Sequence, residues 1–301
     1  MIFIPLEELS AKNKKDVLLF VVKYEKKAVA LASLVKKHSK GIFAVYANEV
    51  DAKNLYGILS LNLTLFFLLP FVNVQRASAL QKDFISSFEK FFFEEKFNFP
   101  ECISGEENGV SIFVNIFEKN GKKIEQLNYY DFMILDKVQF FLLCKEKFKK
   151  NQHENLKVLR CSTNLEKKDW HSVLELQRTY EKEEVVPKNF EFNEVLCNLK
   201  FLKSVKKQYI LVLKVDDKIV SKAGTNAIGF SHVQLGGVFT EKSCRNKGYS
   251  SYLLTVLLSK LLKTSHIPVL FVKKENFAAQ KLYESLGFKK DGSWLIAYLS
   301  V

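Results

Sequence analysis

The sequence contains few cysteines, and their arrangement argues against two kinds of small stabilised fold. The five cysteines are odd in number and far apart, and no two of them form a C-x-x-C pair. Disulfide frameworks use even sets of cysteines and structural zinc sites use paired ligands, so neither is indicated. We therefore expect no metal site, and a reducing, cytoplasmic compartment fits the cysteine usage best.

A long uninterrupted apolar run is also missing. The most apolar stretch, residues 58–74, is broken by Asn62, Thr64, Pro70 and Asn73. It falls short of the roughly 20 apolar residues that a membrane-spanning helix needs, so we interpret it as buried strands. The start of the chain, MIFIPLEELSAKNKK, lacks the basic segment and apolar run of a signal peptide. We expect no membrane partner.

Two familiar phosphate-binding motifs are absent as well. The chain has no G-x-x-x-x-G-K-[ST] loop, and no G-x-G-x-x-G followed by an acidic residue. These motifs mark the P-loop and the dinucleotide-binding fold, respectively. A phosphate-binding site in this chain must therefore use another loop.

Positive charge is in excess, and most of the excess lies in the second half. Residues 1–155 carry 22 basic and 19 acidic residues, whereas residues 156–301 carry 24 and 14. A formal net charge of +13 suggests an anionic partner. The alternatives are a nucleic acid, a membrane surface and a phosphorylated small molecule. The lysines are spread out and do not alternate with aromatic residues in a recognisable module, so we expect no nucleic-acid partner.

Length and composition favour two domains. The 301 residues are 48% hydrophobic, which is enough for one large core or two modest cores. The polar segment 145–157 separates two apolar, strand-like runs. We therefore predict one domain at residues 1–150 and a second at residues 156–301.

The second half has the pattern of a mixed α/β domain. Short apolar segments alternate with segments of helical periodicity in the order β-α-α-β-β-β-α-β-α-β. The predicted strands cover residues 157–161, 209–215, 218–228, 232–240, 267–273 and 293–300, and the predicted helices cover residues 163–184, 189–207, 250–264 and 276–287. Much of this succession recurs between residues 41 and 136, which predicts a duplicated α/β unit.

The loop after strand 232–240 has the features of an anion site. Arg245, Lys247 and Gly248 lie between that strand and a helix that starts near Tyr249. The first N–H groups of a helix lack partners within the helix, and the helix dipole adds partial positive charge there. Gly248 lets the backbone approach a ligand or adopt a positive φ. Taken alone, the loop also fits an ordinary turn with exposed basic residues.

A second pattern follows in the predicted helix 276–287. Asn276 stands at the helix start, Ala279 and Tyr283 lie on the same face, and Gly287 and Phe288 mark its end. With both patterns present, residues 156–301 resemble the GNAT superfamily of acetyl-CoA-dependent N-acetyltransferases. The family's pyrophosphate loop, [QR]-x-x-G-x-[GA], and its later N-x-x-A-x-x-x-Y-x-x-x-G-F helix are matched by Arg245, Gly248 and Ser250 and by Asn276, Ala279, Tyr283, Gly287 and Phe288. Ser250 departs from the family's Gly or Ala.

The resemblance implies a fold of two GNAT-like units in tandem, the first a degenerate copy without the phosphate loop. It also implies acetyl-CoA as cosubstrate, with its pantetheine arm along a strand edge and its pyrophosphate on the loop amides. Gly236 and Gly237 would permit the strand to bulge there. Many members have one more strand after the last one predicted here, and the first half is in a position to supply it. The implied cofactor-binding residues are Val238, Phe239, Thr240, Arg245, Asn246, Lys247, Gly248, Tyr249, Ser250, Ser251 and Asn276.

The resemblance further implies direct transfer of an acetyl group to an amine. Tyr283 would lie beside the thioester sulfur as general acid, although a phenol is a weaker acid than a thiol, so part of its role would be electrostatic. The general base is not fixed, because strand 232–240 carries no carboxylate where several members have one. Glu183 and Glu184 are candidates, His232 is another, and a covalent role for Cys244 is the least favoured.

The sequence thus predicts a cytoplasmic N-acetyltransferase, an acyltransferase that acts on a small-molecule or peptide amine. The acceptor, the acyl-chain length of the donor and the oligomeric state stay open. Two alternatives remain. One is a non-catalytic acyl-CoA-binding module, which the missing strand carboxylate suggests, and the other is a transferase that uses a different acyl donor.

Overall fold

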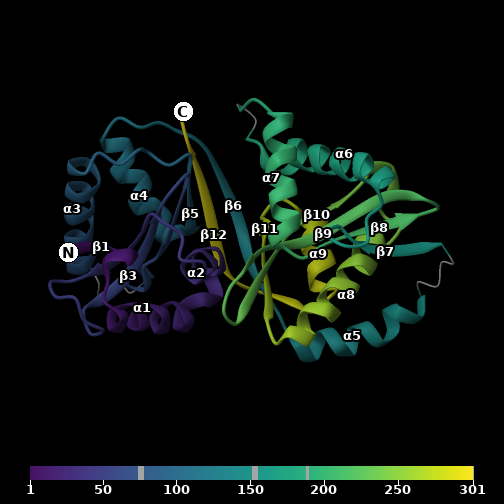
Figure 1. The fold of residues 1–301 in the computed structure, drawn as a ribbon, viewed down its shortest axis with the longest axis horizontal. Helices are drawn as coiled ribbons and strands as arrows, with labels where there is room; N and C mark the ends of the chain where they lie inside the picture. Colours follow the sequence, from purple (N-terminus) through teal and green to yellow (C-terminus); the bar gives the residue numbers. More distant parts are fainter. Residues whose placement is uncertain (74–77, 151–154, 188–189, 301) are drawn as a thin grey trace. The chain divides into compact units, whose positions relative to one another are not determined.

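The structure is a computed structural model that describes residues 1–73, 78–150, 155–187 and 190–300 (Figure 1). The chain divides into two compact units. Unit 1 comprises Met1–Asp131, Gly229–Ser231 and Gly292–Val301, and unit 2 comprises Phe132–Ile228 and His232–Asp291. The division therefore falls after Asp131, earlier than the boundary predicted at 145–157, and a second division falls near the end of the chain.

Unit 2 has the order of elements that the sequence predicts, which confirms the mixed α/β class. β7 to β10 pair antiparallel in succession, and β10 pairs with β11 in parallel. The elements are β7 (Leu156–Arg160), α6 (Trp170–Tyr180), α7 (Glu194–Lys207), β8 (Ile210–Val215), β9 (Lys218–Ile228), β10 (His232–Thr240), α8 (Tyr249–Leu261), β11 (Ile267–Lys273), α9 (Phe277–Glu284) and β12 (Phe288–Leu299).

Local sequence explains why these elements begin and end where they do. Asp216 and Asp217 turn the chain between β8 and β9 with φ values of 45° and 63°, as a tight hairpin requires. Asn193 begins α7, since its side chain accepts a hydrogen bond from the backbone N–H of Leu196 at 2.9 Å. The predicted tight turn and most strand limits are thereby confirmed.

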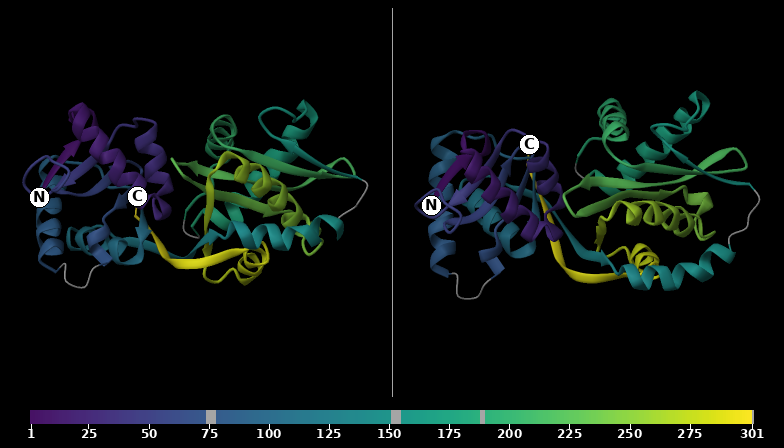
Figure 2. Two further views of the ribbon diagram at one scale, coloured as in Figure 1. Left: turned by 90° about the horizontal axis from the view of Figure 1, so that it is seen from below. Right: turned by 60° about the horizontal axis from the view of Figure 1, so that its bottom comes forward.

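Helices cover both faces of the sheet of unit 2 (Figure 2), so the unit has two hydrophobic cores. One core lies under α6 and α7 and includes Val173, Phe201 and Val212. The other lies under α8 and α9 and includes Leu254, Leu257 and Leu270, all nearly inaccessible to solvent. These cores fix the end of β10 against the start of α8, where the candidate site lies.

Unit 1 repeats the same succession, which confirms the predicted duplication. Its β4 and β5 pair in parallel, as β10 and β11 do in unit 2. The sequence missed its first three regular elements. The elements are β1 (Ile2–Pro5), α1 (Ala11–Tyr24), α2 (Val29–Lys36), β2 (Ile42–Tyr46), β3 (Leu55–Leu61), β4 (Thr64–Leu68), α3 (Ser78–Glu94), β5 (Cys102–Glu106), α4 (Glu107–Lys119) and β6 (Ile124–Leu135).

β6 and β12 each contribute residues to both units. β12 pairs antiparallel with β5 from Trp294 opposite Glu106 to Tyr298 opposite Cys102, within unit 1. The strand order places β6 beside β11, and its last residues belong to unit 2. The first half therefore supplies a strand to the sheet of unit 2, as the sequence suggested.

Several predicted element limits are wrong, among them the start of β12, which lies at Phe288 instead of residue 293, and the start of α7, which lies at Glu194 instead of residue 189. Two further errors have a local cause. Residues 137–150 form the helix α5 (Lys137–Lys150) instead of an extended run followed by a linker. The cause is the carboxylate of Asp136, which accepts hydrogen bonds from the N–H groups of Val138 and Gln139, both at 3.0 Å. The helix predicted from residue 163 begins at Trp170, because the Thr163 hydroxyl bonds the side chain of Asn164 and caps nothing.

Within the described ranges, no helix is both long and apolar enough to cross a lipid bilayer.

Candidate functional site

The site begins where β10 and β11 separate. Their parallel register runs from His232 opposite Ile267 to Gln234 opposite Val269, and within the described chain it contains no later pair. The pairing of β10 with β9 also shifts register between Gly236 and Phe239, so β10 bulges there. Gly237 has a φ of +61°, in the left-handed region that favours glycine. The predicted bulge is confirmed, and it leaves the end of β10 with one edge unpaired by β11.

The loop after β10 presents a row of backbone amides. Asn246 and Gly248 have φ values of +64° and +79°, and α8 begins directly after Gly248. The first backbone bond of the helix runs from Tyr252 N–H to the carbonyl of Gly248 at 3.0 Å. The backbone N–H groups of residues 246–251 have no acceptor in the part of the chain that the structure describes. Such a set of unpaired amides at a helix start is suited to a phosphate.

A cavity of about 340 Å³ lies at this point. It is lined by every predicted cofactor-binding residue except Lys247, whose side chain is exposed, and by Tyr283 and Glu184. Glu183 and His232 do not line it. Cys244, Ala278, Ala279 and Leu282 also line it. The sequence analysis assigned no cofactor role to these four, although Ala278 and Leu282 lie one helical turn apart on α9, and that spacing could have identified them.

A chain of hydroxyl groups joins the end of β10 to the first turn of α8. Ser221 Oγ donates to the carbonyl of Phe239 at 3.0 Å, so it accepts from Thr240 Oγ1 at 2.8 Å. Thr240 Oγ1 in turn accepts from Ser250 Oγ at 2.5 Å. This chain gives Ser250 a structural role at a position where the family motif has Gly or Ala.

Arg245 is held in place by the protein itself. Its Nε donates to the carbonyl of Thr240 at 3.1 Å, and its Nη2 donates to the carboxylate of Glu183 at 2.8 Å. Its guanidinium lies 5.2 Å from the centre of the Phe239 ring. An anion on the loop would therefore compete with Glu183 for Arg245. Since Glu183 is paired at the rim, it is poorly placed to act as a base in the cavity.

Tyr283 lines the cavity from α9. Its side chain is buried, with 8% of its surface exposed, and its ring packs edge-on against Phe288 with 5.8 Å between ring centres. Burial raises the pKa of the phenol above its usual value, and the negative charge of Glu184 raises it further. The hydroxyl thus stays protonated across the neutral range, and it has no hydrogen-bond partner among the described residues.

Asn276 and Glu184 complete the polar lining. Asn276 caps α9, because its Oδ1 accepts from the backbone N–H of Ala279 at 3.0 Å, which confirms the predicted helix start. Glu184 belongs to a short π-helix, Glu181–Val185, and its carboxylate lies 3.5 Å from Lys273 Nζ. π-helical turns of this kind are frequent at functional sites.

Cys244 and His232 do not form a catalytic pair. Cys244 Sγ lies 3.8 Å from the Glu241 carboxylate and 3.7 Å from the Ser243 hydroxyl. His232 stands at the start of β10, eight residues before Thr240 at its other end. A cysteine nucleophile needs an adjacent base such as histidine. The described contacts of Cys244 include no histidine.

The corresponding segment of unit 1 lacks the sequence features of the loop at 240–251. The segment between β4 and α3, residues 69–77 (LPFVNVQRA), contains no glycine and a single basic residue, Arg76. Residues 74–77 lie outside the described ranges. The missing glycine supports the interpretation of unit 1 as a degenerate copy.

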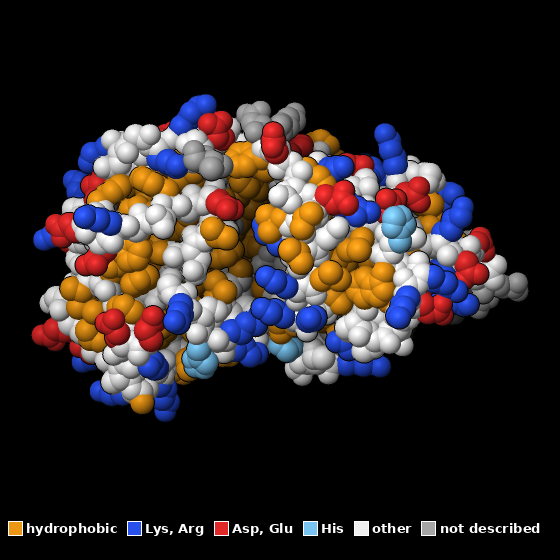
Figure 3. Space-filling view, turned by 45° about the horizontal axis from the view of Figure 1, so that its top comes forward, with side chains coloured by type: hydrophobic (Ala, Val, Ile, Leu, Met, Phe, Trp, Pro, Cys, Tyr) orange, Lys and Arg blue, Asp and Glu red, His pale blue; other side chains and the backbone are white. Residues whose placement is uncertain are grey.

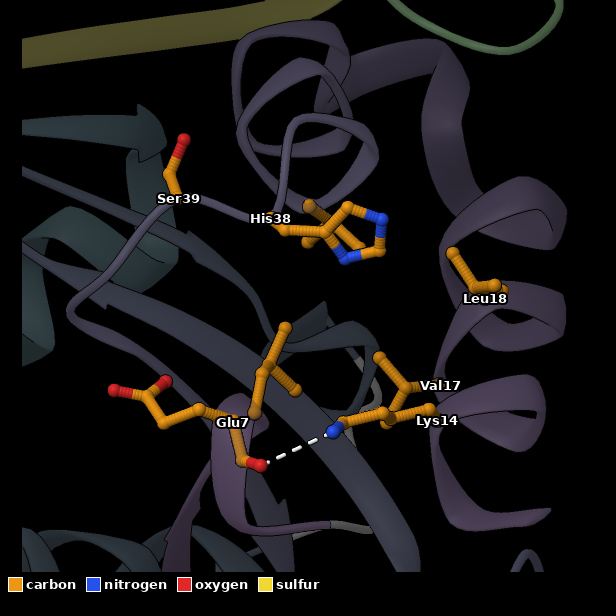
Figure 4. Close-up of a pocket in the computed structure, with 8 residues that line it drawn as sticks. Glu7, Lys14, Val17, Leu18, His38 and Ser39 are labelled. Carbon is orange, nitrogen blue, oxygen red and sulfur yellow. Dashed lines mark hydrogen bonds between the residues drawn. The ribbon is translucent and has the colours of Figure 1, made fainter. Parts of the chain in front are cut away.

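The cavity in unit 1 that Figure 4 shows is of a different kind. Leu6, Val17, Leu18 and Val35 give it apolar walls, and none of its lining residues comes from the connection between β4 and α3. Lys14 Nζ donates to the backbone carbonyl of Glu7 at 3.0 Å across its lower side. This cavity lacks the loop amides and the cap residue that define the site in unit 2.

Comparison with known proteins identifies the class of the second unit. Residues 170–288 match the family model described as Acetyltransferase (GNAT) family. The matched region contains β10, the loop, α8 and α9, so it includes the whole cavity. The match confirms, for residues 170–288, the resemblance to the GNAT superfamily found in the sequence.

Solved structures show the same fold over the full chain. A Drosophila protein has a TM-score of 0.65 at 12% identity, and the match covers 99% of this chain and 98% of that one. A tandem GNAT protein from the clavulanic acid biosynthesis pathway has a TM-score of 0.57 at 9% identity, with the same coverage. A GNAT-family acetyltransferase from Colwellia psychrerythraea has a TM-score of 0.53 at 11% identity and 100% coverage of both chains. A comparison with curated protein sequences gives no significant match.

Proposed function

We propose that the protein transfers an acetyl group from acetyl-CoA to the amine of a small molecule or peptide. The proposal rests on one observation, which is that three features suited to acetyl-CoA meet in a single cavity. It is lined by residues 246 and 248–251, whose amides are unpaired, by the end of β10, whose edge β11 leaves unpaired, and by Tyr283. Acyl transfer is the general chemistry of the family that residues 170–288 match.

The residues present fit acetyl-CoA. Its pyrophosphate would accept hydrogen bonds from the first amides of α8, and Arg245 would add a positive charge beside them. Its pantetheine amides would pair with the backbone of Val238–Thr240, which β11 leaves unpaired. The side chains of Ala278 and Ala279 leave space on the facing helix.

The chemistry divides between Tyr283 and a base. The amine nitrogen attacks the thioester carbon, the C–S bond breaks, and the thiolate accepts a hydrogen bond from the Tyr283 hydroxyl. Because the pKa of Tyr283 is raised, full proton transfer to a thiolate is uphill by more than about 2 kcal/mol, so its main contribution is electrostatic. Of the two predicted acidic bases, only Glu184 lines the cavity.

A second candidate is a non-catalytic acyl-CoA-binding module, and a third is a transferase for another acyl donor. The observation that favours the second is the absence of any carboxylate on β10, whose sequence is HVQLGGVFT. Tyr283, a buried residue that lines the cavity and offers a hydroxyl as donor, favours catalysis. The test is to titrate the protein with acetyl-CoA in a calorimeter and then to measure acetylated product with a panel of primary amines. Binding with product formation supports the transferase, binding without product supports the module, and no binding contradicts both.

Glu183→Gln separates the two acidic candidates for the base. We expect turnover within about twofold of wild type, and acetyl-CoA affinity that is unchanged or tightened by up to about fivefold. The reason is that Glu183 competes for Arg245 through a partly exposed ion pair, which contributes at most about 1 kcal/mol. Turnover and calorimetric affinity are the measurements. A tenfold loss of turnover would instead make Glu183 the base.

We also propose a cytoplasmic enzyme without a nucleic-acid or membrane partner. Cys102, Cys161, Cys197 and Cys244 are free thiols, which supports a reducing compartment. On the side of unit 2 that the right-hand part of Figure 3 shows, Lys and Arg side chains lie among Asp and Glu side chains. This distribution supports a local anion site over a broad basic surface.

A further inference from the structure

Unit 2 contains a second cavity, of about 240 Å³, between its α6–α7 layer and the sheet. Two of the segments that line the first cavity, β10 and the π-helix, also line this one. On β10, Gly236 and Gly237 face the second cavity and the next residues face the first. On the π-helix, Glu181 and Val185 face the second cavity and Glu184 faces the first. The two cavities therefore lie next to each other at the bulge of β10.

Lys222, on β9, is a buried lysine at this junction. Its side chain is 2% exposed, and its Nζ donates to the carbonyl of Gly237 at 2.9 Å and lies 3.8 Å from the centre of the Tyr180 ring. No carboxylate of the described chain lies within 4.0 Å of it. Lys214, also buried in unit 2, instead has the carboxylate of Asp169 at 3.0 Å. Lys222 is thus buried without an ion pair.

Lys200 on α7 also lines the second cavity and acts on the charge of Glu181. Besides Tyr180, three titratable groups interact with Lys222 from the elements packed on it. They are Glu181 on the π-helix, Cys161 after β7 and Cys197 on α7. Burial lowers the pKa of Lys222 to about 7, although the charge of Glu181 acts in the opposite direction. Near neutral pH, a large fraction of Lys222 is therefore the free amine, which can accept a proton.

We propose that the second cavity holds the acceptor as a primary aliphatic ammonium, and that Lys222 takes the proton that this ammonium must lose. The inference rests on the proposed acetyl transfer. Among the residues that line this cavity, Glu181 is the single carboxylate, and it is positioned by Gln177, whose Nε2 donates to it at 2.9 Å. Glu181 would pair with the ammonium, and Lys222, which lines the same cavity, contacts the bulge through the Gly237 carbonyl.

All protons and bonds of this reaction are accounted for. One proton moves from the ammonium to Lys222 Nζ, the neutral amine forms the new C–N bond, and the C–S bond breaks. The second proton of the attacking nitrogen ends on the thiol of CoA, and Lys222 later releases its proton to solvent. A base with a pKa near the working pH is efficient for this step. A cation formed on Lys222 is stabilised by the Gly237 carbonyl and by the face of Tyr180.

The experiment compares wild type with Lys222→Met, and with Lys218→Met as control. Methionine fills the space of lysine without a charge to bury, so the variant is expected to fold. Lys218 is an exposed lysine on the same strand and lines neither cavity. The probes are glycine, 1,4-diaminobutane, L-lysine amide and a tripeptide with a free amino terminus. Acetylated product is measured from pH 6 to 10, and acetyl-CoA affinity is measured by calorimetry.

We expect Lys222→Met to bind acetyl-CoA as wild type does and to lose about 100-fold in kcat/KM at pH 7. The loss should shrink as the pH approaches about 10, where the acceptor is itself deprotonated, whereas a purely structural role would give the same loss at every pH. Glu181→Gln should raise KM roughly tenfold with kcat retained. The inference is overturned if Lys222→Met binds acetyl-CoA normally and its kcat/KM is either unchanged or reduced equally at every pH. It is also overturned if wild type forms no product from any probe at pH 9.5. Absence of acetyl-CoA binding in wild type overturns the proposed function instead.

Discussion

Gly248→Val should weaken acetyl-CoA binding by about 1,000-fold. Gly248 directly precedes α8, and a Cβ added there would meet no protein atom within 4 Å, so packing within the chain does not require glycine. A branched side chain would instead occupy the space in front of the loop amides, where the pyrophosphate is proposed to lie. Losing two charge-assisted hydrogen bonds at about 2 kcal/mol each gives a change of this size. Calorimetric titration with acetyl-CoA measures it.

Gly121→Val provides a matched control for this variant. Gly121 follows α4 in unit 1 with a φ of +82°, close to the +79° of Gly248, and a Cβ there also meets nothing within 4 Å. Both substitutions place valine in a left-handed conformation, which costs about 1–2 kcal/mol of stability. We expect similar losses of thermal stability and a loss of binding for Gly248→Val alone. Equal acetyl-CoA affinities in the two variants would contradict the proposed position of the pyrophosphate.

Tyr283→Phe should lower kcat by about 100- to 1,000-fold with the acetyl-CoA dissociation constant within about twofold of wild type. Phenylalanine keeps the ring that packs on Phe288 and removes only the hydroxyl, which has no partner in the described chain. Loss of one preorganised donor to a developing negative charge has effects of this size. Steady-state rates and calorimetry on the same preparations separate the two quantities.

The pH dependence of the rate is a second measurement on Tyr283→Phe. Because its raised pKa keeps Tyr283 protonated across the neutral range, the shape of the rate profile between pH 6 and 9 should be the same in both proteins. Tyr252→Phe, on α8 and outside the cavity lining, should leave kcat unchanged. Parallel losses of kcat and binding in Tyr283→Phe would show that the phenol positions the cofactor and does not act on the thiolate.

Short-range patterns in the sequence account for the parts of the fold that were predicted well. The β8–β9 hairpin follows from two residues that tolerate positive φ, Asp216 and Asp217, and the start of α9 follows from the capping side chain of Asn276. The bulge in β10 follows from its two consecutive glycines. These features are determined by residues within a few positions of each other, so a single sequence suffices to identify them.

Features that depend on distant residues were not predictable in the same way. The pairing of Arg245 with Glu183 joins residues 62 positions apart, and it removes from the cavity one of the predicted bases. The sequence KIVSKAGTNAI shows that Lys222 lies on a strand, but its burial depends on α6, the π-helix and α7, which pack over it. The division of β6 and of β12 between the two units likewise has no local signal. For these reasons the loop at residues 240–251 was predicted from sequence, whereas the second cavity was found only in the fold.

The most direct test of the account is a crystal structure of the protein with CoA bound. We predict density for the pyrophosphate on the amides of residues 246–251, for the pantetheine along Val238–Thr240, and for the sulfur within hydrogen-bond distance of the Tyr283 hydroxyl. Density for CoA at another place, or none at saturating CoA, would contradict the assignment of this cavity as the cofactor site.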